Sequence, residues 1–193
     1  MTLEDLPRIS DPVIMRALAH PARVAIMEYL GGVPAGATAT ECAQVVSLSP
    51  SATSYHLRAL DRAGFVEEAP GRGDGRERLW RARVRSYSID AGDSQDPETL
   101  AAEEAVIGVF LTMEHERALR WLRQQRSEPS AWRRAAFMTD AQILITPDEL
   151  TELESRIKAL VAPYKRSARE LDAPAEARQV SLQVRAVPVA PPG

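Results

Sequence analysis

The stretch TECAQVVSLSPSATSYHLRALDRAGFVE, residues Thr40–Glu67, decides the fold of this chain. It contains two helical segments, Thr40–Val46 and Pro50–Ala63, with only residues 47–49 between them. The pair Ser49-Pro50 is typical of a helix start, with serine as the N-cap and proline at the first helical position. Two helices joined by so short a connection predict a helix-turn-helix, whose second helix enters the major groove of DNA.

The second of these helices has two distinct faces. At 3.6 residues per turn, one stripe is predicted to be buried and consists of Thr53, Leu57 and Leu60. The opposite, exposed face carries Ser51, Tyr55, Arg58 and Arg62. Hydroxyl and guanidinium groups suit base edges and phosphates. Ser49 and Ser51, at the positive end of the helix dipole, are additional candidates for holding a phosphate.

A glycine-rich hairpin follows the second helix. Residues 65–68 and 76–84 have strand character, and the loop between them contains three glycines. Residues 49–85 hold eight arginines and five acidic residues, whereas residues 91–193 hold 13 basic and 16 acidic ones. We therefore expect phosphate contacts from this region alone, with the hairpin as a wing that carries Arg72, Arg76 and Arg78.

Together with the segment ALAHPARVAIMEYL (Ala17–Leu30), the opening stretch resembles the ArsR-like winged helix-turn-helix transcriptional regulators over roughly residues 9–84. The resemblance implies a homodimer that binds operator DNA and whose affinity a bound effector changes. The residues matching the family's DNA-reading helix are Ser51, Ser54, Tyr55, His56 and Arg58, and those matching its wing are Arg72, Arg76 and Arg78.

The fold class predicted for the whole chain is mainly α with a small β component (α+β). We expect a winged helix-turn-helix DNA-binding domain over residues 9–90 and a C-terminal region over residues 96–189. Further helices are predicted at 12–19, 21–30, 96–126 and 147–167. Strands are predicted near 142–145 and at 180–189, and with the intervening helix they would form a small β-α-β appendage.

The helix predicted over residues 96–126 is apolar over too wide an arc for a simple surface helix. The helix has two neighbouring apolar sides. One consists of Leu100, Ile107, Leu111 and Leu122. We assign dimerisation to the other, which consists of Val106, Val109, Phe110 and Met113. The family resemblance also implies dimerisation through this helix, assisted by the first one. A small organic effector is a further candidate partner, with a pocket lined by Phe110, Met113, Trp121, Trp132, Phe137 and Met138. The alternative interpretation of these six side chains is ordinary core.

Several other functions find little support in the sequence. Cys42 is the only cysteine, so neither an intrachain disulfide nor the cysteine-rich shell of a soft-metal sensor can form. No cofactor is expected, and a hard-metal site involving His115 and Glu104 at a dimer interface remains an alternative. We find neither a Gly-rich phosphate loop with a lysine nor a nucleophile elbow, and we expect no enzymatic activity.

The expected location is the cytoplasm. The chain has no apolar stretch long enough to span a membrane, and residues 1–10 lack the apolar core of a signal peptide. The leading prediction is thus a homodimeric regulator of transcription that acts as a repressor rather than as an activator. The alternatives are a winged-helix protein-interaction module without specific DNA binding, and a metal-responsive sensor.

Overall fold

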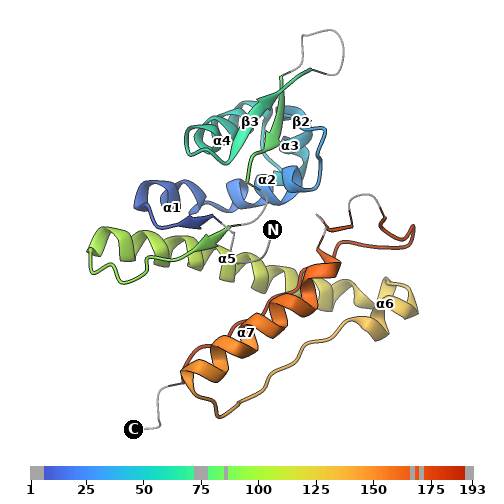
Figure 1. Cartoon of the computed structure of the whole chain (residues 1–193). Helices are drawn as coiled ribbons and strands as arrows, with labels where there is room; N and C mark the ends of the chain where they lie inside the picture. The colour runs from blue at the N-terminus through green and yellow to red at the C-terminus, as the bar shows by residue number, and fades with distance from the viewer. Residues whose placement is uncertain (1–6, 72–77, 85–86, 166–167, 170–171, 190–193) are drawn as a thin grey trace. The chain divides into compact units, whose positions relative to one another are not determined.

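The computed structural model describes residues 7–71, 78–84, 87–165, 168–169 and 172–189 (Figure 1). The chain divides into two compact units, residues 1–141 and 142–193. The first unit therefore contains the helix-turn-helix together with the long helix that follows it. The boundary expected from the sequence, near residues 90–96, lies inside this unit.

Four helices form the N-terminal part of the first unit, and each is preceded by an N-cap residue whose side chain accepts a hydrogen bond from the first turn. They are α1 (Pro12–Leu18), α2 (Pro21–Gly31), α3 (Ala39–Val46) and α4 (Pro50–Arg62). Three of them begin with proline, and α3 begins with a capping box in which Thr38 and Glu41 exchange hydrogen bonds. These helices were predicted from the same local signals, and the structure confirms them to within about a turn.

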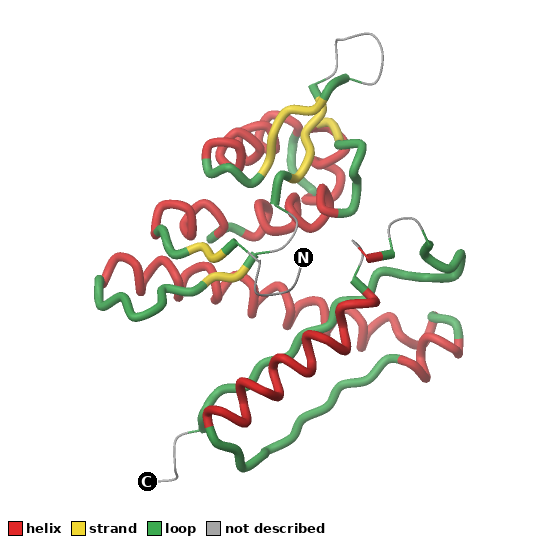
Figure 2. The backbone as a smooth tube through the Cα atoms, viewed as in Figure 1, coloured by secondary structure: helices red, strands yellow, loops and turns green. Residues whose placement is uncertain are grey.

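A three-stranded antiparallel sheet completes the winged domain. Its strands are β2 (Ala37–Thr38), β3 (Val66–Ala69) and β4 (Leu79–Ala82), in the order β2-β4-β3 (Figure 2). The last two form the hairpin that the sequence predicts. A second, parallel pair joins β1 (Arg8–Ile9) to β5 (Ser88–Ile89). The arrangement is an α+β winged helix-turn-helix.

The core of the winged domain lies between the helices and the sheet. It is built from large aliphatic side chains that have no solvent exposure or almost none: Met15, Leu18, Ile26, Leu30, Leu57, Leu60, Val66 and Leu79. Trp80 of β4 is also buried. Every helix of the domain contributes to this cluster, so α4 is held by packing on one side along its length.

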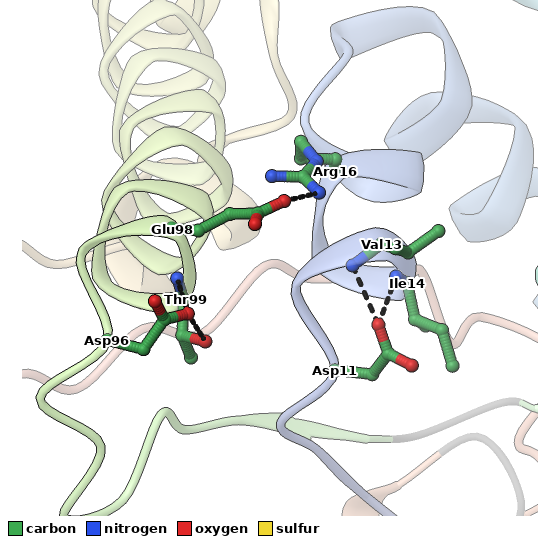
Figure 3. A network of polar contacts seen from close by, with 7 residues as sticks. All are labelled: Asp11, Val13, Ile14, Arg16, Asp96, Glu98 and Thr99. Atoms are coloured by element: carbon green, nitrogen blue, oxygen red, sulfur yellow. Dashed lines mark hydrogen bonds and ion pairs between the residues drawn. The ribbon is translucent and has the colours of Figure 1, made fainter.

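The long helix α5 (Pro97–Gln124) packs along α1 (Figure 1). Figure 3 shows how the two helices begin: Asp11 accepts from the backbone of α1, Asp96 accepts from the backbone and hydroxyl of Thr99, and Arg16 pairs with Glu98 across the contact. Towards the other end, Arg117 pairs with Glu28 of α2 at 2.9 Å. These ion pairs are partly exposed, so burial of apolar side chains is the main force that holds α5 to the domain.

The rest of the chain differs from the sequence prediction. After α5 come a 3₁₀ helix (Gln125–Ser127) and α6 (Ser130–Ala135), and the second unit contains α7 (Pro147–Val161) and a 3₁₀ helix (Ala162–Tyr164). The strands predicted near 142–145 and at 180–189 are wrong, because both segments lack strand hydrogen bonds, and the β-α-β appendage is wrong with them. None of the described residues of the second unit is buried.

We expect position 36 to tolerate only glycine, because the backbone there has a left-handed conformation and lies close to strand β4. Gly36 has a φ of 81°, and a Cβ placed there would lie 2.9 Å from the carbonyl oxygen of Trp80. Gly64 has a similar φ of 78° with no atom within 4 Å of such a Cβ. Gly64→Ala should cost about 1–2 kcal/mol of unfolding free energy for the left-handed conformation, and Gly36→Ala a further ~1–3 kcal/mol for the forced backbone shift. Urea denaturation of both variants measures the difference, and equal losses would show that the contact with Trp80 has no cost.

Candidate nucleic-acid interface

The turn between α3 and α4 is fixed by backbone conformation and one cap. Ser47 closes α3 in the left-handed region, with a φ of 54°, and the backbone N–H of Leu48 donates to the carbonyl of Ala43 at 3.2 Å. The Ser49 hydroxyl then accepts from the backbone N–H of Ala52 at 3.2 Å and starts α4. The turn is therefore as short as the sequence predicts, and it sets the direction of α4 relative to α3.

The two faces of α4 agree with the prediction from periodicity. Thr53, Leu57 and Leu60 are completely buried. The opposite face is exposed and consists of Ser51, Tyr55, Arg58 and Arg62. Their spacing of four, three and four residues places them in one stripe along about 16 Å of the helix. We call these four residues the α4 stripe.

Two of the serines predicted to contact DNA, Ser49 and Ser54, also form hydrogen bonds with the backbone of α4. The hydroxyl of Ser54 donates to the carbonyl of Pro50 at 2.8 Å, and the side chain is only partly exposed. Ser49 acts as the N-cap described above. A serine hydroxyl that accepts from an amide can still donate to a phosphate, so the cap role of Ser49 is compatible with an anion at the start of α4.

His56 does not belong to the exposed face. Its side chain is only 8% exposed and packs against His20, with ring centroids 4.5 Å apart, while Tyr55 beside it is 58% exposed. The family resemblance implied that His56 reads DNA, and the structure corrects this, because position 56 lies about 100° around the helix from position 55. The signal for its burial is the contact with α2, which helix periodicity alone does not contain.

The described part of the wing carries paired charges. Arg78 contacts Glu68 at 3.1 Å, and Glu67 contacts both Arg81, at 2.6 Å, and Arg83, at 3.5 Å. These cross-strand pairs offset part of the positive charge that the sequence count places here. Arg78 nevertheless keeps a largely exposed side chain. The other two wing candidates, Arg72 and Arg76, lie outside the described residues.

The side of α5 that we assigned to dimerisation faces its own domain. Val106 is completely buried in the core of the winged domain, Phe110 packs against that core, and Val109 and Met113 are half-buried. The dimerisation assignment of Val106 is therefore wrong. The neighbouring side is the exposed one, and we call it the α5 stripe: Leu100, Ile107, Leu111 and Leu122 are each 41–49% exposed.

The six residues of the candidate effector pocket do not share one environment. Phe110, Met113, Trp121 and Trp132 are half-buried. Phe137 and Met138 are 75% and 60% exposed, unlike side chains that line the wall of a cavity. The assignment of Phe137 and Met138 to an enclosed pocket is therefore corrected.

The environment of Cys42 disfavours metal binding. The thiol is completely buried, and burial together with the nearby Glu41 raises its pKa to about 11. A metal needs the thiolate, which is scarce at neutral pH under these conditions. Within the described residues, His, Cys, Asp and Glu side chains form no group of three or more that could hold a metal ion. Among the same residues, no helix is both long and apolar enough to cross a membrane.

Comparison with known proteins supports the N-terminal assignment. Residues 18–69 match the family of helix-turn-helix domains, so this segment, from α2 to β3, is a helix-turn-helix domain. Over 54 residues the chain is 37% identical to the HTH-type transcriptional regulator YgaV of Escherichia coli (strain K12). That alignment covers 28% of this chain and 54% of the relative, so the chain spans about half the length of the curated relative that it matches.

Two solved structures resemble the chain more distantly. One is a mutant of Lactococcus lactis ZitR in apo form, with 16% identity, a TM-score of 0.33 and coverage of 76% of this chain and 84% of that one. The other is the PcaV transcriptional regulator from Streptomyces coelicolor in complex with its natural ligand, with 15% identity, a TM-score of 0.31 and coverage of 74% of each chain.

Proposed function

We propose that this protein is a homodimeric regulator of transcription of the ArsR-like group that binds double-stranded DNA. The observation that carries the proposal is the α4 stripe, which presents hydroxyl, phenol and guanidinium groups on the exposed side of a helix whose other side is buried. This is the geometry of a helix that enters a major groove. We assign phosphate contacts to the N-terminal end of α4 and to Arg78 of the wing, whose side chain is largely exposed.

The α5 stripe supports the homodimer. Four large aliphatic side chains, each about half-exposed, follow one side of α5 while the other side is packed on its own domain. Pairing of this stripe with its copy in a second chain is an isologous contact with twofold symmetry. Such a dimer presents two α4 helices to successive major grooves, about 34 Å apart, and predicts an operator with an inverted repeat.

Repression is the simplest consequence of this geometry. A dimer that occupies two adjacent major grooves of a promoter excludes other proteins from the same DNA. In a cell the regulator acts where the DNA is, in the cytoplasm of a bacterial-type cell.

Control by a small organic effector would act through α5, where Phe110, Met113 and Trp121 are half-buried, by changing the distance between the two DNA-binding heads.

The test of DNA binding begins with selection of a site. The purified full chain is incubated with a library of random double-stranded DNA, bound duplexes are amplified, and the recovered sequence is titrated at two salt concentrations. We expect a short inverted repeat whose affinity falls as salt rises, because phosphate contacts release counterions. Weak binding that is independent of sequence would contradict the proposal.

Arg58→Ala should weaken binding to the selected duplex without unfolding the protein. Arg58 is exposed on the α4 stripe, and loss of one DNA contact by an arginine costs about 1–3 kcal/mol, or about 5- to 150-fold in Kd. The matched control is Arg123→Ala, which removes an exposed arginine from the end of α5 and should leave Kd unchanged. Fluorescence anisotropy gives both values, and circular dichroism shows that each variant is folded.

The same experiment separates the alternatives. A winged-helix protein-interaction module would bind DNA weakly and with the same Kd in wild type and Arg58→Ala. A metal-responsive sensor would release the duplex on addition of a divalent metal at micromolar concentration. The burial of Cys42 weighs against a metal site that uses this thiol.

A further inference from the structure

Three side chains connect the recognition helix α4 to the joint between α1 and α2. His20 is the N-cap of α2, and its Nδ1 accepts from the backbone N–H of Ala22 at 3.1 Å. Arg23 donates from Nε to Nδ1 of His56 on α4 at 3.4 Å, and from Nη1 to the carbonyl of Ala17 on α1 at 3.0 Å. The two imidazole rings are 4.5 Å apart. We call His20, Arg23 and His56 the histidine link.

Both hydrogen bonds of the histidines require a neutral ring. A nitrogen accepts a hydrogen bond only when it carries no proton, so each ring must hold its single proton on Nε2. Protonation makes both ring nitrogens donors and converts two attractive contacts into a donor facing a donor. It also places a positive charge beside Arg23, whose guanidinium remains charged at every relevant pH.

The surroundings of the link favour the neutral form. The pKa of His20 is lowered mainly by burial and then by the charge of Arg23. The pKa of His56 is also lowered mainly by burial, followed by His20 and then Arg23. Tyr55 contacts the ring of His56 from α4 with its own ring. Three charged groups on the neighbouring helices have partners elsewhere: Arg16 of α1 pairs with Glu98, Glu28 of α2 pairs with Arg117, and Glu41 of α3 caps its own helix.

The sign of the pH effect follows from these shifts. A histidine whose pKa in the folded state lies below its ordinary value of about 6.5 binds a proton more readily when the contact is broken. Its contribution to stability is complete above about pH 6.5 and is lost as the pH falls through the lower, folded value. Acid therefore favours conformations in which α4 has separated from the α1–α2 joint.

We infer that the histidine link positions the recognition helix only while both rings are neutral, so that acidification weakens binding of the protein to its DNA. This inference rests on the DNA-binding function proposed above and adds proton-dependent control to it. The bistable element is the contact between α4 and α2, and the proton is the ligand that biases it.

The sign of the effect distinguishes this inference from a direct contact with DNA. A histidine that touched phosphates would gain a favourable charge on protonation, and DNA binding would tighten in acid. His56 is buried against His20 on the side of α4 away from solvent, so the structure predicts weakening instead.

The test uses the full chain, the selected duplex and two variants. His20→Asn combined with His56→Gln keeps a good N-cap at position 20 and an amide oxygen able to accept from Arg23 at position 56, and neither side chain titrates. His115→Asn is the matched control, because it removes the third histidine of the chain from the exposed surface of α5. Kd is measured at pH 7.5, 6.5 and 5.5 at constant ionic strength.

We expect the wild type and His115→Asn to lose about three- to tenfold in affinity between pH 7.5 and 5.5, an interval that includes the ordinary histidine pKa of about 6.5. The double variant should change by clearly less. An equal loss in the double variant, or tighter binding of the wild type in acid, would overturn the inference.

A second measurement keeps the inference separate from the proposed function. The midpoint of thermal unfolding is recorded over the same pH range without DNA, and the Cε1 proton of each wild-type histidine is titrated by NMR. Should no duplex be selected, the proposed function fails, but the link still predicts that His56 titrates below pH 6.5 and that acid lowers the wild-type midpoint more than that of the double variant. Titration of His56 at or above pH 6.5 would contradict the link whether or not the double variant folds.

Discussion

Replacing Ile107 and Leu111 together by glutamate should abolish the proposed homodimer and reduce affinity for the selected inverted repeat by about 10²- to 10⁴-fold. Both side chains lie at the centre of the α5 stripe and are 41% exposed in the single chain. In a twofold dimer the two substitutions bring four carboxylates into an apolar contact, where charge is costly. A monomer also loses the gain in effective concentration that a second bound head provides.

The matched control is Ala105→Glu. Ala105 is exposed on the same helix, but two residues correspond to about 200° of rotation, so it lies on the far side from Ile107. Sedimentation equilibrium measures the mass of each variant, and anisotropy measures its affinity for the duplex. A dimeric Ile107→Glu, Leu111→Glu variant would show that the α5 stripe is not the interface, and the assembly would have to form elsewhere.

Val106 of α5 was predicted to lie at a dimer interface but is buried in its own domain, because sequence periodicity does not predict which side of a helix packs on the domain. The pattern establishes that the helix has two apolar sides, because this depends only on the spacing of residues along one helix. Which side faces the helix's own domain depends on contacts with α1 and α2, about 80 residues away in the sequence. Val106 and Ile107 are neighbours of similar size and polarity, yet the first is completely buried and the second is not.

The predictions that the structure confirms were based on local signals. Serine, threonine or aspartate before a proline, or three residues before a glutamate, favours a helix start through local contacts alone, and five of the helices begin in this way. The faces of α4 were also predictable, since leucine and arginine at helical spacing separate an inner side from an outer one. His56 was not, because an imidazole suits either environment and its burial depends on His20 and Arg23.

The errors in the second unit have a related cause. Residues 180–189 alternate between apolar and polar side chains, which is the pattern of a strand with one buried face. A strand, however, exists only when a partner supplies its hydrogen bonds, and the partner is not specified by the alternation itself. The two-residue strands β1 and β5 illustrate the reverse case, since their pairing joins segments about 80 residues apart and is too short to leave a periodic pattern.

Leu57→Ala should lower the free energy of unfolding by about 2–5 kcal/mol, the range for a leucine truncated in a packed core. Leu57 is completely buried and belongs to the cluster that includes Leu60, Leu30 and Val66. Such a loss is a large part of the total stability of a small domain. Urea denaturation followed by circular dichroism measures it, and Tyr55→Ala, an exposed change on the same helix, should stay within about 0.5 kcal/mol.

The comparison of Leu57→Ala with Arg58→Ala tests the assignment of both faces of α4, because the two residues are adjacent in sequence and differ in direction. Leu57→Ala should lose stability while the folded fraction retains its Kd for the duplex, and Arg58→Ala should lose affinity while its unfolding free energy is unchanged. A loss of stability below about 1 kcal/mol for Leu57→Ala would mean that α4 is not anchored by this side. The exposure of the α4 stripe would then not be fixed by packing, and the geometric basis for a DNA-reading helix would be lost with it.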